Sequence, residues 1–201
     1  MGEQLPDLRT NALHLCIDMQ RLFGQEGPWS TPWMARALPQ CVALAERQPQ
    51  ATIFTRFITP ATAEETVGAW RDFYHRWPET TRDRLHASLL ELLPELARFT
   101  PPARVFDKPV YSAFASRRLL AHLRERSIDT VILSGAETDI CVLSSALGAV
   151  DHGYKVVIAT DAVCSYSDAG HDALLALFRE RFSQQVAAAT TGEILDHWQR
   201  D

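Results

Sequence analysis

Short apolar runs alternate with helical patterns along this chain, and that alternation constrains the fold more than any other feature. Each run ends at polar or turn residues, which is typical of strands buried on both faces of a sheet. Strands that alternate with helices form βαβ units with right-handed crossovers around a mainly parallel sheet. The six runs are Ala12–Ile17, Ala51–Thr55, Arg104–Phe106, Thr130–Leu133, Lys155–Ala159 and the weaker Gln185–Ala189.

The segment between the second and third runs departs from this alternation. Residues 60–102 are rich in Pro, Thr, Arg and aromatic residues, and we expect them to form an insertion with helices over Ala61–Tyr74 and Leu85–Leu93. No internal repeat or linker interrupts the rest, so residues 1–201 are expected to fold as a single α/β domain. The other helices are predicted over Pro32–Gln48, Ala115–Arg126, Thr138–His152, Gly170–Phe182 and Gly192–Trp198.

Composition excludes several classes of protein. A net charge of -5 gives no basic footprint for nucleic acid. No apolar stretch approaches the roughly 20 residues that span a bilayer, and the chain does not start with a basic segment followed by an apolar run, so we expect a cytoplasmic protein without membrane contact. The four cysteines form no C-x-x-C pair, which argues against zinc-ribbon and thioredoxin-like sites.

Polar residues that follow the predicted strands suggest where a ligand would bind. In open parallel sheets, ligands bind beyond the carboxyl ends of the strands, near the point where the strand order reverses. With the order 3-2-1-4-5-6, Asp18 after the first strand would lie beside the loop after the fourth strand, and Cys141 would sit in the first turn of the next helix. Lys108 follows the third strand and would reach the same edge.

These three residue types suit nucleophilic catalysis. A cysteine in the first turn of a helix is expected to have a lowered pKa, Asp18 can take the thiol proton, and Lys108 can stabilise developing charge. Backbone N–H groups of residues 137–141 can form an oxyanion hole. Each residue also has an ordinary interpretation, namely core packing for Cys141, a turn or cap for Asp18 and a surface charge for Lys108. The spatial argument alone does not displace those interpretations.

Three motifs resemble those of the isochorismatase-like cysteine hydrolase superfamily. They are LCIDMQRLFG at Leu15–Gly24, FDKPVYSAF at Phe106–Phe114 and LSGAETDICV at Leu133–Val142. The resemblance covers about residues 10–190. It implies a three-layer Rossmann-like fold, with a six-stranded parallel sheet and helices on both faces, and an Asp18–Lys108–Cys141 triad. It also implies a cis peptide between Ala136 and Glu137, which would aim the amides of Glu137 and Cys141 at an oxyanion, and a homo-oligomer, either a dimer or a tetramer.

Departures from the family pattern favour one branch. Nicotinamidases of this family carry an Asp-x-His and a further His after the second strand, which bind a metal. This chain has TRFITP at Thr55–Pro60 with only His75 nearby, so neither a metal nor another cofactor is expected. True isochorismatases cleave a vinyl ether and lack the cysteine. Cys141 therefore favours the metal-independent amidohydrolase branch that resembles N-carbamoylsarcosine amidohydrolase and acts on small amides, ureides or carbamoyl compounds.

The substrate contacts and the function both have open alternatives. Candidate pocket residues are Phe23, Arg56, Trp70, Tyr74, Trp77, Tyr111 and Phe114. The three insertion aromatics among them could instead pack the insertion onto the body or a neighbouring subunit, and a surface or structural ion pair is the favoured interpretation of Arg56. A vinyl-ether hydrolase and a non-catalytic binding protein on the same fold are the alternative functions. A Ser-His-Asp hydrolase is disfavoured because no G-x-S-x-G elbow occurs.

Overall fold

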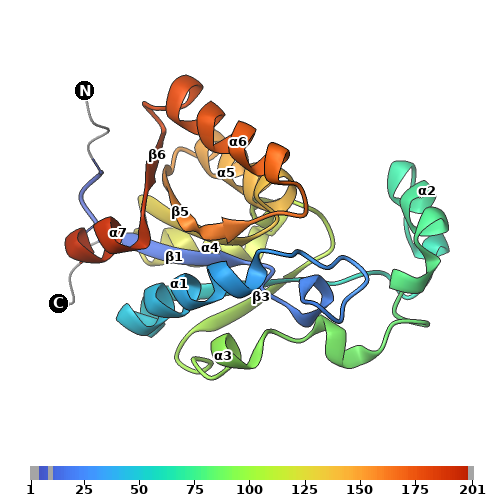
Figure 1. The fold of residues 1–201 in the computed structure, drawn as a ribbon. Helices are drawn as coiled ribbons and strands as arrows, with labels where there is room; N and C mark the ends of the chain where they lie inside the picture. The colour runs from blue at the N-terminus through green and yellow to red at the C-terminus, as the bar shows by residue number, and fades with distance from the viewer. Residues whose placement is uncertain (1–4, 9–10, 199–201) are drawn as a thin grey trace.

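All six strands lie in one parallel sheet with the order β3-β2-β1-β4-β5-β6, which confirms the predicted fold class (Figure 1). The structure is a computed structural model and describes residues 5–8 and 11–198. Because β1 and β4 are neighbours at the centre, the direction of winding reverses between them. The strands are β1 (Ala12–Ile17), β2 (Thr52–Phe57), β3 (Arg104–Lys108), β4 (Thr130–Ala136), β5 (Lys155–Cys164) and β6 (Val186–Ala189).

Helices cover both faces of the sheet (Figure 1). One face packs against α4, α5 and α6 through a core that contains Leu13 and Leu15, and the other packs against α1 and α7 through a core that contains Cys16. Successive residues of β1 thus point to opposite faces, as the pleat of a strand requires. The bounds are α1 (Met34–Arg47), α4 (Arg117–Glu125), α5 (Leu143–Asp151), α6 (Asp168–Arg181) and α7 (Thr191–His197).

One prediction about the strands is wrong at the sheet edge. The third strand was expected to be buried on both faces, yet four of the five residues of β3 are exposed or half-buried, and Val105 is 38% exposed. The reason is topological: β3 pairs with β2 alone and forms one edge of the sheet.

The insertion between β2 and β3 contains less helix than predicted. Its helices are α2 (Ala69–Arg76) and α3 (Pro94–Ala97), with short 3-10 turns elsewhere. The predicted helix over Ala61–Tyr74 begins only at Ala69 because Gly68 has a φ of 56°, outside the helical region. The predicted helix over Leu85–Leu93 is a 3-10 turn at Ala87–Leu90, since Leu93 is extended before Pro94 and its N–H bonds to Met19 instead.

The insertion extends beyond the carboxyl end of the sheet. Figure 1 shows α2 projecting to one side of the layered body, beyond the ends of the central strands. Within the described ranges 5–8 and 11–198, no helix has both the length and the apolar character needed to cross a membrane.

Candidate active site

The strand order brings the three predicted catalytic residues to one edge of the sheet. Asp18 directly follows β1, Lys108 is the last residue of β3, and Cys141 lies in the turn after β4. Lys108 starts two strands away from Asp18 and reaches it past Phe57, the last residue of β2. Its Nζ lies 5.0 Å from the centre of the Phe57 ring. The parallel sheet therefore accounts for contacts between residues far apart in the sequence.

Asp18 is the best-anchored side chain of this group. Its Oδ2 lies 2.6 Å from Lys108 Nζ, and the two side chains are only 0% and 2% exposed. Its Oδ1 accepts a hydrogen bond of 2.6 Å from Thr55 Oγ1, which in turn accepts the Asp18 N–H at 3.1 Å. Asp18 itself has a φ of 48°, a left-handed conformation that costs about 1–3 kcal/mol and persists where its surroundings hold it.

The two Asp18 oxygens differ in their hydrogen bonding. Oδ1 is held by Thr55, whereas Oδ2 contacts Lys108 without an aligned hydrogen bond from any described residue. Lys108 donates to the Val110 carbonyl at 3.0 Å instead. Burial lowers the pKa of the Lys108 ammonium, but the charges of Asp18 and Cys141 offset this and leave the pKa above its ordinary value. Oδ1 is thus fixed by Thr55, whereas Oδ2 is the oxygen paired with the Lys108 ammonium.

The environment of Cys141 corrects one expectation. Cys141 lies in a π-helical turn, Thr138–Val142, that leads into α5, and it is 4% exposed. The predicted lowering of its pKa is wrong: burial and then the nearby Asp18 carboxylate raise the pKa of the thiol well above its ordinary value, although Lys108 opposes this. A helix terminus lowers a thiol pKa only where burial does not outweigh it. Burial therefore favours the neutral thiol at Cys141.

The turn before Cys141 has an unusual backbone. The peptide bond between Ala136 and Glu137 is cis, as the family resemblance implied. The Glu137 carbonyl accepts hydrogen bonds from Ile140 N–H at 3.2 Å and from Val142 N–H at 3.0 Å. The two donors are the residues directly before and after Cys141, so Cys141 lies within this wide turn. Wide turns of this kind occur often at functional sites.

A cavity of about 570 Å³ opens above Cys141. Of the predicted substrate contacts, Phe23, Trp77 and Tyr111 line it. Trp29 and Phe57 add further aromatic surface, with Trp29 stacked on Phe23 at a centroid distance of 5.9 Å. The cavity is therefore mostly aromatic, with polar groups contributed by the loops after β4 and β5.

Four predicted contacts do not line the cavity. Arg56 forms a two-pronged ion pair with Asp107, at 2.8 and 3.0 Å, and a third bond with Glu91, so the ion-pair interpretation is confirmed. Trp70 and Tyr74 stack on each other at a centroid distance of 6.1 Å within the insertion, and Tyr74 is buried.

Phe114 is also buried, in the core on the side of α4 and α5, where its ring lies 5.7 Å from that of Tyr154. Trp70 and Tyr74 nevertheless pack against residues that do line the cavity, since the Trp70 ring lies 4.7 Å from that of Tyr111 and the Tyr74 ring 5.2 Å from that of Phe73. Sequence position alone could not distinguish these arrangements.

Sequence reasoning missed several residues of the site. Thr55 orients Asp18. The signal in the sequence is a polar residue within a mostly buried strand, since a buried hydroxyl needs a partner. Glu137 was assigned a role only through its backbone, yet its side chain lines the cavity. No sequence pattern identified the remaining lining residues, which are Pro28, Trp29, Ser30, Phe57, Phe73, Asp139, Ile140, Ser165, Tyr166 and Ser167.

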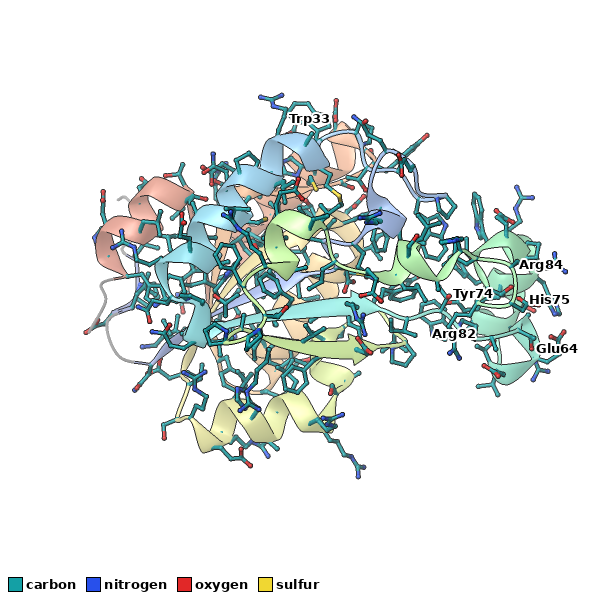
Figure 2. All side chains as sticks on the ribbon, turned by 90° about the horizontal axis from the view of Figure 1, so that it is seen from below. Trp33, Glu64, Tyr74, His75, Arg82 and Arg84 are labelled. Carbon is teal, nitrogen blue, oxygen red and sulfur yellow. The ribbon has the colours of Figure 1, made fainter. Side chains whose placement is uncertain are left out.

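His75 does not line the cavity. His75 Nε2 lies 3.2 Å from Glu64 Oε1, and Figure 2 shows both residues at the outer end of the insertion. Across the described part of the chain, no three His, Cys, Asp or Glu side chains are grouped so that they could hold a metal ion. That the protein needs no metal or other cofactor stays a prediction.

Comparison with known proteins agrees with this geometry. The isochorismatase domain family matches residues 12–192. The chain belongs to the isochorismatase domain family. An uncharacterised isochorismatase family protein, PncA, of Bacillus subtilis is 36% identical over 113 residues, which is 56% of this chain and 61% of that protein. Maleamate amidohydrolase of Pseudomonas putida is 28% identical over 93 residues, covering 46% and 44% of the two chains. Similarity to these curated relatives thus extends over about half of their lengths.

Solved structures share the fold over nearly the whole of this isochorismatase-family chain. A cysteine hydrolase from Pseudomonas syringae pv. phaseolicola has a TM-score of 0.81 at 24% identity, covering 96% of this chain and 97% of its own. N-carbamoylsarcosine amidase from Thermoplasma acidophilum has a TM-score of 0.72 at 21% identity, covering 90% and 97%. At these identities the likeness concerns the fold.

Proposed function

We propose that this chain is a metal-independent cysteine hydrolase that cleaves a carbon–nitrogen bond of a small amide, ureide or carbamoyl compound. The observation that carries the proposal is the buried Asp18–Lys108 ion pair beneath an aromatic cavity that also exposes Cys141. A buried ion pair is weak evidence for stability but marks a functional site when a nucleophile lies beside it. Matches to proteins named maleamate amidohydrolase and N-carbamoylsarcosine amidase support the same class of bond.

The first step forms a covalent bond to sulfur. Cys141 Sγ attacks the amide carbonyl carbon while its proton passes to the Asp18 carboxylate beside it. Because burial raises the pKa of the thiol, the proposal has the proton leave sulfur as the carbon–sulfur bond forms. Lys108 stays protonated throughout and compensates the changing charge on Asp18 and sulfur.

The second step expels the amine. The carbonyl oxygen of the tetrahedral intermediate carries a negative charge, which the N–H groups of Glu137 and Cys141 would stabilise; removal of one such donor in other enzymes costs about 3 kcal/mol. The carbon–nitrogen bond breaks as the nitrogen takes the proton from Asp18, and this releases ammonia or an amine and leaves a thioester on Cys141. Water, activated by Asp18, then attacks the thioester carbonyl, and the acid and the free thiol are regenerated.

The decisive experiment measures ammonia release from a panel of small amides, ureides and carbamoyl compounds, with Cys141→Ala and Cys164→Ala compared with the parent. Cys164 is also buried but lies at the end of β5 and does not line the cavity, so it is a matched control. We expect turnover that is lost in Cys141→Ala and kept in Cys164→Ala. Turnover that persists in Cys141→Ala would contradict the proposal, and a thioester adduct on Cys141 detected by mass spectrometry would support it.

Three expectations from the sequence accompany this proposal. We propose that residues 1–201 act as one domain, that the protein forms a dimer or tetramer, and that it works in the cytoplasm on a small-molecule substrate. Light scattering of the purified chain would report the oligomeric state.

A further inference from the structure

The charges that line the cavity are all acidic. Glu137 and Asp139 both contribute to its wall, and no lysine, arginine or histidine is found among the described residues that line it. Two cations at the same edge of the sheet are already paired: Lys108 lies in its ion pair with Asp18, and Arg56 is bound by Asp107 and Glu91. A substrate carboxylate in this cavity would therefore meet repulsion without a compensating partner.

The two acidic side chains are held in place by the loop after β5. Glu137 Oε1 accepts the Tyr166 N–H at 3.3 Å, and Asp139 Oδ1 accepts a short hydrogen bond from Ser165 Oγ. Gly170 at the start of α6 leaves room for Asp139, since a Cβ there would lie 2.5 Å from Asp139 Oδ2. These contacts thus hold both carboxylates in the wall of the cavity.

The electrostatics of Glu137 reach the reacting groups. Burial and the neighbouring charge of Asp139 raise the pKa of Glu137 to about 7. The charge of Glu137 also contributes to the raised pKa values of Cys141 and Tyr111, after burial and closer charges. A cation bound beside Glu137 would relieve the repulsion between the two acids and would sit within electrostatic range of the nucleophile.

The rest of the wall suits a flat, apolar group. Trp29 and Phe73 lie at a centroid distance of 5.8 Å, and Phe57 and Tyr111 stack at 6.5 Å with an angle of 19° between their planes. All four residues line the cavity. Aromatic faces attract cations as well as apolar rings, so the aromatic and acidic parts of the wall favour the same kind of ligand.

We propose that the preferred substrate is an amide of an aromatic or similarly apolar compound that carries an ammonium group, and that amides carrying a carboxylate are rejected. The acid-lined, aromatic cavity without a free cation carries this inference, which rests on the proposed amidohydrolase function. It separates this chain from a maleamate-type or N-carbamoyl amino acid substrate, since both of those carry a carboxylate.

The test uses three matched arylacetamides that bear an aminomethyl, a hydroxymethyl or a carboxyl group at the position opposite the amide chain. We expect kcat/KM at pH 8 to fall in that order, with at least a tenfold difference between the first and the last. In Glu137→Gln and Asp139→Asn the ratio between the ammonium and carboxylate compounds should shrink by at least threefold. Glu180→Gln removes one charge from an exposed position on α6 and should leave the ratio unchanged.

A binding measurement distinguishes failure of this inference from failure of the proposed function. The same compounds are titrated into Cys141→Ala, with tryptophan fluorescence as the readout, because Trp29 and Trp77 line the cavity. If the compounds bind in the expected order but the parent releases no ammonia from any of them, the hydrolase proposal fails and the charge preference stands. Equal or better binding of the carboxylate compound, an unchanged ratio in both acid variants, or no binding at all would overturn the inference.

Discussion

Replacing Thr55 with valine isolates the contribution of a residue that holds Asp18, the proposed acid–base group. Thr55 Oγ1 donates to Asp18 Oδ1 at 2.6 Å and accepts the Asp18 N–H at 3.1 Å, and all three atoms are buried. Valine has nearly the same shape, so Thr55→Val leaves one buried N–H and one carboxylate oxygen without these partners. A buried group left unsatisfied costs about 1–3 kcal/mol, so the free energy of unfolding should fall by about 2–5 kcal/mol.

The loss should appear in two assays. For a chain of this size, each kcal/mol corresponds to about 2–4 °C, so the melting temperature should fall by about 4–20 °C in a circular dichroism melt. Ammonia release should fall about 10- to 100-fold in kcat, because Asp18 loses its fixed orientation toward Cys141.

Thr59→Val is the matched control for this substitution. Thr59 is also buried, but its hydroxyl has no hydrogen-bond partner among the described residues. Its replacement should therefore change stability and turnover little. If Thr55→Val and Thr59→Val behaved alike in both assays, the hydrogen bonds from Thr55 would not be what orients Asp18, and the reasoning would be refuted.

Three further perturbations test other parts of the structure. Lys108→Met leaves the Asp18 carboxylate buried without its counter-charge and should cost about 3–5 kcal/mol in urea unfolding, whereas the double variant with Asp18→Asn should regain stability but not activity. Gly135→Ala places a Cβ 2.0 Å from the Ile17 carbonyl at a φ of 104°, so both the melting temperature and turnover should drop, and a native-like variant would contradict this. Burial lowers the pKa of His14 to about 3, so the unfolded state binds the extra proton below its usual pKa of 6.5. The free energy of unfolding should therefore fall by up to about 1.4 kcal/mol per pH unit as the pH drops from 6.5 toward 3. The His14→Gln variant should lack this contribution to the slope.

Much of the architecture could be predicted from hydrophobic patterning. Short runs that are almost wholly apolar, such as Ala12–Ile17 and Thr130–Leu133, predict central strands. Helices cover both faces of such strands, so nearly every side chain in them is buried. The pattern failed in the insertion, where Gly68 delays the start of one predicted helix to Ala69 and only a 3-10 turn forms before Pro94 in place of the other. Local backbone restrictions of this kind act through single residues and leave little periodic signal.

The part of the candidate site that depends on which strands are neighbours in the sheet could be predicted from the sequence. Placing Asp18 and the Cys141 turn at adjacent strand ends required only the strand order, since parallel strands end at the same edge. The ionisation of Cys141 could not be predicted, because it depends on how deeply the thiol is buried and on the distance to Asp18. An ion pair was the favoured interpretation of Arg56, but its partners could not be named, because Asp107 and Glu91 come from another strand and from the insertion.

The sequence by itself therefore determined the kind of sheet, the identity of the candidate nucleophile and its acid–base partner, and the turn that carries them, because these depend on residue type and order along the chain. Only the tertiary structure decided which aromatic side chains line the cavity, that Thr55 holds Asp18, and that the cavity charges are acidic. Those features depend on how side chains from separate strands and loops are oriented in space, and burial and distance then set their interactions.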